Sequence, residues 1–254
     1  MANNMDHHII FYKETDSTNT RISVLAKEGA PEGTVAWADY QTAGKGRRGR
    51  SWESPAGNNL YFSILLRPDI KPEKAPMLTL VMAYSVAKAI ENAEKMQVQI
   101  KWPNDLILSK KKICGILTEM SLVGNQIDYV VIGVGINVNR REFPQELQEK
   151  ATSLCIEKGE AVDCERLLGQ ILREFAEQYD QFLEIQDLLF LQEEYEQMLV
   201  NKNQEVLVLE PGNEYQGLAL GINREGELLV KRENGETEAV FAGEVSVRGI
   251  YGYV

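Results

Sequence analysis

The sequence predicts an α+β protein with a mixed or antiparallel sheet, followed by a small β-barrel. Between residues 98 and 139, strand-like runs are separated by only two to four turn residues, which is the spacing of antiparallel hairpins. Two segments, 75–94 and 163–199, have the apolar periodicity of helices. After Asn201, five short strand-like runs follow one another with turns at PGN, REG, ENG and AG, which is typical of a small barrel.

The N-terminal third predicts three strands and one helix. Residues 8–14 alternate like a strand, and the cap residues of DSTN (16–19) precede a short helix that ends at Gly29. Residues 33–40 form the next strand. The run at 59–68 is long and mostly apolar, so we expect both of its faces to be covered.

The rest of the chain divides into a larger and a smaller unit. The helix at 75–94 is apolar around most of its circumference, which predicts a central, buried position. Short hairpin strands follow it, and then the amphipathic helical region. A chain of 254 residues suits one large domain, or a domain of about 200 residues with a small appendage, and we expect domains over 1–200 and 201–254.

Composition bounds the class of protein. Of 254 residues 44% are hydrophobic and the formal net charge is −11, so a core of ordinary size is expected and broad nucleic-acid binding is disfavoured. No apolar run approaches the ~20 residues that span a bilayer. The N-terminus lacks the features of a signal peptide. We therefore expect a cytoplasmic protein without a membrane partner.

The cysteines and histidines exclude several kinds of chemistry. Cys114, Cys155 and Cys164 are odd in number and lack C-x-x-C spacing, which argues against a disulfide framework or a zinc site. The histidines, His7 and His8, are adjacent, so on a strand they point to opposite faces and make a poor metal pair. With so few histidines, Ser-His or Cys-His catalysis is disfavoured. Catalysis would have to use Lys, Arg, carboxylates and backbone groups.

A glycine-rich basic stretch, GKGRRGR at 44–50, stands out in this acidic chain. Four cations lie within it: Lys45, Arg47, Arg48 and Arg50. The glycines satisfy G-x-G-x-x-G, but a dinucleotide site needs a helix after the last glycine, and RSWESPAGNNL cannot form a first helical turn. A loop that closes on a small anionic ligand fits better, because glycine permits close approach and the cations donate charge-assisted hydrogen bonds. A merely solvated basic loop stays open as the alternative.

Further along the chain, two stretches add charged groups. KWPNDL at 101–106 places three polar residues around a tight turn between strands: Lys101, Asn104 and Asp105. Lys112 leads into an apolar strand, where it can reach a carboxylate or a phosphate. Ordinary turn chemistry and a solvated hairpin lysine stay open as the alternatives.

Two more stretches are noteworthy. GVGIN at 133–137 has glycines at two-residue spacing in a strand, which suits close approach by a ligand or by another backbone, and Asn137 gives it a polar end. In GEVSVR at 243–248, Arg248 could face a neighbouring domain, although an edge-strand arginine is equally ordinary.

Seven stretches follow one another along almost the whole chain: DSTN at 16–19, YQTAGKGRRGRSW at 40–52, NLYFS, KWPNDL, KICGIL, VIGVGIN and GEVSVRG. In this order they resemble the motifs of the biotin protein ligases, or biotin–[acetyl-CoA-carboxylase] ligases. The resemblance implies a catalytic core similar to class II aminoacyl-tRNA synthetases, followed by an SH3-like barrel.

The chain also departs from the family pattern. Bifunctional members carry a winged helix-turn-helix before DSTN, whereas 15 residues precede that motif here, so we expect a monofunctional ligase without a DNA partner. The basic loop usually begins with an arginine where this chain has Lys45. A lysine keeps the charge but not the bidentate fork.

The resemblance implies two half-reactions. Biotin and ATP give biotinyl-5′-AMP and pyrophosphate, with Mg²⁺ on the phosphates, and the adenylate then acylates a lysine of a biotin carboxyl carrier domain. By match to the family, biotin would contact Ser17, Thr18, Asn19, Gln41, Gly44, Lys45, Gly46, Arg47, Lys112 and Gly115. ATP would contact Arg47, Arg50, Trp52, Lys101, Asn104, Asp105, Lys112, Asn137 and Arg248. The catalytic set would be Lys112, Arg47, Lys101 and Asp105, with no protein cluster dedicated to a metal.

Within the catalytic set, Asp105 could assist deprotonation of the acceptor amine. The cationic stretch would cover the reactive adenylate until the carrier docks. Monomers and homodimers both occur in the family. The alternatives are a lipoate or octanoyl ligase, a non-catalytic biotin-sensing regulator, and a structural or RNA-binding protein.

Overall fold

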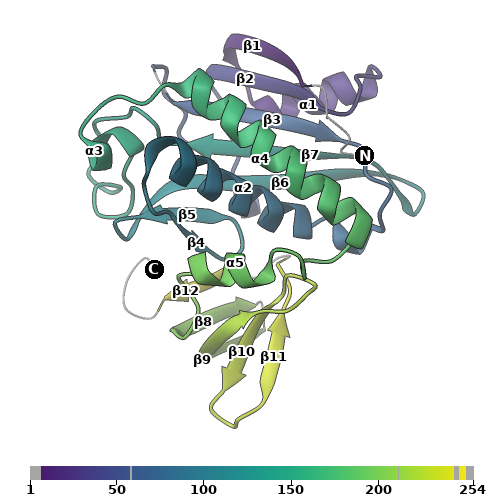
Figure 1. Cartoon of the computed structure of the whole chain (residues 1–254), viewed down its shortest axis with the longest axis vertical. Coiled ribbons are helices and arrows are strands. Elements are labelled where there is room, and N and C mark those ends of the chain that lie inside the picture. The colour runs from purple at the N-terminus through teal and green to yellow at the C-terminus, as the bar shows by residue number, and fades with distance from the viewer. Residues whose placement is uncertain (1–6, 58, 211, 243–245, 250–254) are drawn as a thin grey trace.

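The computed structural model describes residues 7–57, 59–210, 212–242 and 246–249, and it contains two sheets (Figure 1). The larger sheet has seven strands in the order β1-β2-β3-β7-β6-β5-β4. They are β1 (His8–Thr15), β2 (Thr34–Gln41), β3 (Leu60–Leu66), β4 (Gln99–Lys101), β5 (Asp105–Leu108), β6 (Lys111–Val123) and β7 (Gln126–Ile136). Strands β1 and β2 are parallel and the other neighbouring pairs are antiparallel, which confirms the predicted mixed sheet.

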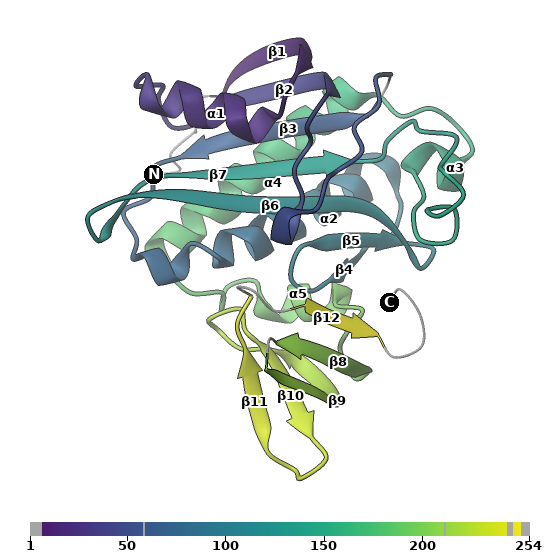
Figure 2. The same ribbon diagram turned by 180° about the vertical axis from the view of Figure 1, so that it is seen from behind.

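Helices cover both faces of the large sheet. Helix α1 (Thr18–Lys27) makes the crossover between β1 and β2 and packs on one face (Figure 2). On the other face lie α2 (Met77–Glu94) and α4 (Cys164–Ile185) (Figure 1). Strand β3 is therefore buried along its whole length, and α2 is buried over most of its length, as the apolar sequences of both predict.

The predicted helical region at 163–199 is interrupted. Helix α4 begins at the N-cap Asp163, whose carboxylate accepts from the Arg166 backbone, and it ends where Gln186 adopts a left-handed conformation. A separate helix, α5 (Gln192–Met198), follows after a short non-helical segment. A short helix α3 (Leu154–Lys158) was not predicted, because five residues are too few to show a helical period.

The smaller sheet has five antiparallel strands in the order β11-β10-β9-β8-β12, which confirms the predicted five strands. They are β8 (Glu205–Glu210), β9 (Asn213–Ile222), β10 (Leu228–Arg232), β11 (Thr237–Val240) and β12 (Ser246–Gly249). Helix α5 lies between the two sheets (Figure 1). The indole Nε1 of Trp102 donates to the Gly226 carbonyl at 2.9 Å, which ties the β4–β5 turn to the small sheet. The domain boundary at residue 200 stays a prediction.

The cationic loop, residues 42–57 between β2 and β3, crosses the α1 face of the large sheet as far as β6 (Figure 2). It contains one 3₁₀ turn, Arg47–Gly49, and no helix follows Gly49. Strand β3 then runs antiparallel to β2. This path excludes a dinucleotide-binding βαβ unit, as the sequence predicts. Within the described ranges, no helix is long and apolar enough to cross a membrane.

Candidate active site

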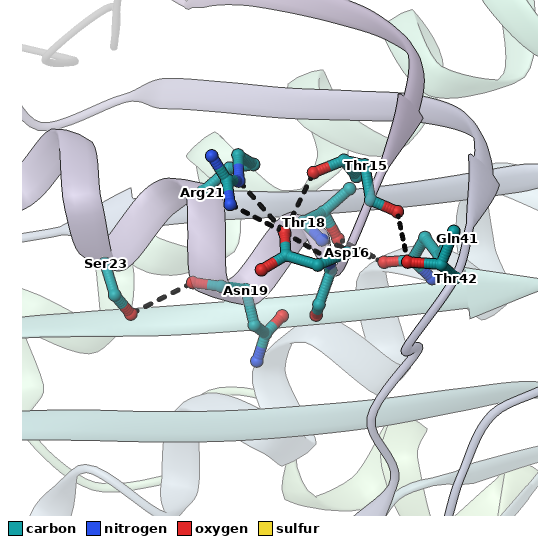
Figure 3. A network of polar contacts seen from close by, with 9 residues as sticks. Thr15, Asp16, Thr18, Asn19, Arg21, Ser23, Gln41 and Thr42 are labelled. Carbon is teal, nitrogen blue, oxygen red and sulfur yellow. Dashed lines mark hydrogen bonds and ion pairs between the residues drawn. The ribbon is translucent and has the colours of Figure 1, made fainter.

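Uncharged polar side chains form the floor of a pocket on the α1 face of the sheet. Ser17 is the N-cap of α1. The next residue, Thr18, donates from its backbone to Gln41 Oε1 at 2.8 Å and from its hydroxyl at 3.2 Å (Figure 3). The Gln41 amide in turn donates to Ser54 Oγ at 2.7 Å. These bonds join the start of α1 to the end of β2.

Asp16 holds the segment before α1 in place (Figure 3). Its Oδ1 accepts from the Ser17 backbone at 2.8 Å, from the Thr15 hydroxyl at 3.0 Å and from Arg21 Nε at 3.0 Å. The hydrogen bond with Arg21 is the main cause that lowers the pKa of Asp16 to about 2. Asp16 is thus a support for the DSTN segment rather than part of the pocket surface.

Asn19 occupies the middle of the floor, against the large sheet. Its Oδ1 accepts from Ser63 Oγ at 2.6 Å, and its Nδ2 donates to Glu119 Oε2 at 2.7 Å. A Cβ placed on Gly133 would lie 1.9 Å from Asn19 Oδ1. Only glycine at position 133 therefore lets Asn19 reach this place.

Trp52 fills the space beside Asn19. A Cβ on Gly135 would lie 2.5 Å from the Trp52 Nε1 atom, and a Cβ on Gly115 would lie 3.0 Å from the same ring. The strand glycines are predicted to permit close approach by a ligand or another backbone, and this stays a prediction. Gly133 and Gly135 line the inner pocket, and their nearest neighbours are the side chains of Asn19 and Trp52.

Charged groups converge at the other end of the pocket. Lys112 Nζ lies 2.6 Å from Asp105 Oδ1, which also accepts from Asn104 Nδ2 at 3.0 Å. Arg47 donates from Nη1 to Asn104 Oδ1 at 2.8 Å and from Nη2 to the Ala242 carbonyl at 2.7 Å. The cationic loop thereby contacts both the β4–β5 turn and the segment that follows β11 of the small sheet.

Lys101 is buried, with 7% of its surface exposed, whereas the Lys112 side chain is 23% exposed. Burial is the main cause that lowers its pKa to about 8, and the neighbouring cations Lys112 and Arg248 lower it further, whereas Asp105 opposes them. Lys101 lines an outer cleft of about 750 Å³. This volume lies in the range of ~300–1,000 Å³ that small-molecule sites occupy.

The structure brings most of the predicted site residues together. The inner pocket is lined by Ser17, Thr18, Asn19, Gln41, Lys45, Gly46, Arg47, Trp52, Asn104, Lys112 and Gly115. The outer cleft adds Arg50, Lys101, Asp105 and Arg248. Of the motif around Arg248, residues 243–245 lie outside the described part of the chain.

Two predicted residues line neither space. Gly44 is a buried residue of the loop itself, where a Cβ would come within 2.5 Å of the Trp52 carbonyl oxygen and 2.7 Å of Ser54 Oγ. Asn137 is buried at the end of β7, and its Nδ2 donates to the Thr152 carbonyl at 3.1 Å. A role for Asn137 toward a nucleotide stays a prediction.

Sequence reasoning missed three supporting residues: Ser54, Ser63 and Glu119. Ser63 is fully buried in β3 and lies 2.7 Å from Thr18 Oγ1 and 2.6 Å from Asn19 Oδ1. The signal was present, because Ser63 interrupts the apolar run LYFSILL and Glu119 the apolar run ICGILTEM. Neither pattern says which distant side chain meets the polar group.

Comparisons with known proteins point to one family. Residues 11–137 match the biotin/lipoate A/B protein ligase family, and residues 203–248 match the biotin protein ligase C terminal domain. The bifunctional ligase/repressor BirA of Bacillus subtilis is 40% identical over 235 residues, which are 91% of this chain and 71% of that protein. The biotin–[acetyl-CoA-carboxylase] ligase of Mycobacterium tuberculosis is 30% identical and is covered over 86% of its length.

A solved structure extends the similarity to the whole fold. The biotin protein ligase from Aquifex aeolicus in complex with biotin and ATP superposes with a TM-score of 0.83 at 33% identity, over 95% of this chain and 99% of that one. The chain belongs to the biotin/lipoate A/B protein ligase family and, within it, to the biotin protein ligases. This confirms the resemblance. The predicted absence of a DNA-binding unit stays a prediction.

Proposed function

We propose that this protein activates biotin with ATP as biotinyl-5′-AMP and transfers the biotinyl group to a lysine of a biotin carboxyl carrier domain. One observation carries the proposal: a neutral polar pocket opens directly onto a cluster of three buried or half-buried cations. A neutral pocket suits biotin's ureido ring, and the cations suit a carboxylate that must meet a triphosphate.

In the first half-reaction, a biotin carboxylate oxygen bonds to the α-phosphorus of ATP while the bond to pyrophosphate breaks. Both reactants are anions, so cations must neutralise them as they approach. Lys112 is held by Asp105 at the junction of pocket and cleft, 5.2 Å from the Trp52 ring centroid, and is assigned to the carboxylate and α-phosphate. Arg47 approaches the same junction from the loop. Lys101 faces the phosphates from the cleft, where Arg248 would bind the nucleotide from the small sheet.

In the second half-reaction, the acceptor amine attacks the carbonyl of the mixed anhydride and AMP leaves. The amine must lose a proton, and we assign its acceptance to Asp105, whose Oδ1 lies at the junction. Until the carrier docks, the anhydride must be kept from water. The cationic loop is assigned this covering role, because Arg47 spans from Asn104 to the Ala242 carbonyl across the opening.

Mg²⁺ fits this site only together with the nucleotide. Across the described residues, no cluster of three or more His, Cys, Asp or Glu side chains could hold a metal. The cleft offers the carboxylates of Asp105 and Glu149. Mg²⁺ usually keeps several waters and binds substrate phosphates plus one or two carboxylates, so ATP would supply most of its ligands. When bound, it would neutralise phosphate charge.

The proposal is tested by ATP–pyrophosphate exchange. Exchange that requires biotin, is not supported by lipoate, and is followed by labelling of a carrier domain is the expected result. Calorimetry with biotin and with lipoate provides a second measurement. Exchange that proceeds equally with lipoate would contradict the assigned substrate, and absence of exchange with either acid would contradict ligase chemistry.

A further inference from the structure

A continuous path of polar contacts runs through the pocket floor, and both of its ends lie on the cationic loop. At one end, Ser54 of the loop accepts from Gln41, which is bonded to Thr18. In the middle, Ser63 bridges Thr18 to Asn19. The other end is formed by Glu119, which joins Asn19 to Lys45 of the loop. The floor and the loop are therefore parts of one network.

Glu119 is the residue where this path leaves the floor. Its Oε2 accepts from Asn19 Nδ2 at 2.7 Å, and its Oε1 lies 3.8 Å from Lys45 Nζ. The other acceptor of the Asn19 amide nitrogen, the Leu117 carbonyl, is at 3.5 Å. Without Glu119, the Asn19 amide nitrogen would lose its short, charge-assisted bond and keep only the longer contact with the Leu117 carbonyl, while Oδ1 would still accept from Ser63.

We propose that Glu119 is a positioning residue with two separable tasks, one toward each neighbour. Its Oε2 orients the Asn19 amide in the inner pocket. Its Oε1 attracts Lys45 and so favours the position in which the cationic loop covers the site. This inference rests on the proposed function and adds to it the residue that links biotin binding to loop position.

The two tasks differ in expected size. The contact with Asn19 is short and partly buried, whereas Lys45 and Glu119 have side chains that are 46% and 41% exposed. Exposed ion pairs contribute little, and salt weakens them further. The Asn19 task should therefore dominate biotin affinity, and the Lys45 task should appear as a smaller effect on retention of the adenylate.

The test compares Glu119→Ala with Glu119→Gln. Glutamine keeps an oxygen that accepts from Asn19 but loses the charge that attracts Lys45. We expect Glu119→Ala to raise the KM for biotin in pyrophosphate exchange about tenfold or more, with kcat within about twofold, as loss of a bond to a charged group implies. Glu119→Gln should restore the KM to within about threefold of the unchanged protein.

The Lys45 task is read from the rate at which biotinyl-5′-AMP leaves the protein. Glu119→Gln should speed release about two- to fivefold at low salt, the range of an exposed ion pair. In the Lys45→Ala background, Glu119→Gln should add nothing. Glu14→Gln removes one carboxylate from an exposed position of β1 and serves as the charge-matched control.

Two results would overturn the inference. If Glu119→Ala leaves the KM for biotin within twofold, or if Glu119→Gln raises it as much as alanine does, Asn19 is not oriented by this carboxylate. If the double variant releases biotinyl-5′-AMP faster by the product of the two single-variant fold-increases, the ion pair of Glu119 with Lys45 does not hold the loop. Both differ from failure of the proposed function, in which the unchanged protein itself shows no biotin-dependent exchange.

Discussion

The inner pocket and the outer cleft share Gly46, Arg47, Trp52, Asn104 and Lys112, but the rest of their linings differ. The floor of the inner pocket consists mainly of neutral hydrogen-bonding groups such as Thr18 and Gln41, which bond to one another. The cleft concentrates cations, among them Lys101, which burial brings to a pKa of about 8. Under the proposed function, this contrast separates recognition of an uncharged ring from chemistry on two anions. Five changes test it and are given in order of decreasing effect.

Lys112→Ala should have the largest effect, because it removes the cation at the junction of pocket and cleft. We expect adenylation to fall by at least two to three orders of magnitude, since a well-placed charge in a transition state contributes roughly 3 kcal/mol or more. Pyrophosphate exchange measures this. Lys110→Ala, at an exposed hairpin position, is the matched control. A rate near that of the unchanged protein would remove Lys112 from the mechanism.

Arg47→Gly should uncouple formation of the adenylate from its retention. The variant loses the bonds to Asn104 and to the Ala242 carbonyl, so the loop is no longer tied across the opening. We expect biotinyl-5′-AMP still to form but to escape and label lysines of bystander proteins. Mass spectrometry of a mixture of carrier and bystander detects this, and labelling confined to the carrier would contradict the covering role.

Gly133→Ala should damage the neutral floor while sparing the cations. The added methyl would meet Asn19 at 1.9 Å, so Asn19 must move. We expect the KM for biotin to rise by about tenfold or more, from the lost hydrogen bonds of the displaced amide, with a smaller change in the KM for ATP. Gly169→Ala in α4, where the nearest atom is 3.7 Å from the added Cβ, is the control. An unchanged KM for biotin would show that Asn19 does not contribute to binding.

The pH dependence should report on Lys101. Its pKa is lowered to about 8, so the cation is mostly present at pH 7 and is lost as the pH rises through 8. The kcat/KM of adenylation for ATP should therefore fall above pH 8, because this ratio reports the pKa values of the free protein. In Lys101→Arg the charge persists to higher pH, so the same fall should be absent in that range. Rate profiles from pH 6.5 to 9.5 compare the two, and identical profiles would assign the titration to another group.

Asp16→Asn should have the smallest effect. The folded-state pKa of Asp16 is about 2, below the ordinary value of 3.8, so its stabilising contribution is present above pH 3.8 and is lost as the pH falls toward 2. Asp16 and Arg21 have side chains that are 39% and 38% exposed, so we expect Asp16→Asn to lower the free energy of unfolding by less than about 1 kcal/mol at neutral pH. Urea unfolding at pH 6 and pH 3 measures it. A loss that does not shrink at the lower pH would contradict the assignment.

Local patterns predicted most of the elements and the residue sets. The apolar run of β3 predicts burial on both faces, and the turn at Lys101–Asp105 lies where KWPNDL predicts it. The short α3 and the break between α4 and α5 were missed, because neither leaves a long periodic signal. The path of polar contacts through Ser63 and Glu119 was missed for a different reason. A single polar residue in an apolar strand does not indicate which distant side chain it contacts.

The side chains available to the site can be read from the chain: neutral cap residues at DSTN, cations in the loop and at the strand ends, and glycines at alternate positions of β7. Which of them meet depends on how the chain packs in three dimensions. Gly133 and Gly135 make room for Asn19 and Trp52, and Arg47 reaches a carbonyl 195 positions away at Ala242. The physical reason is that the period of a strand or helix specifies which face a side chain occupies, whereas the partner on that face is set by packing between segments distant in the chain.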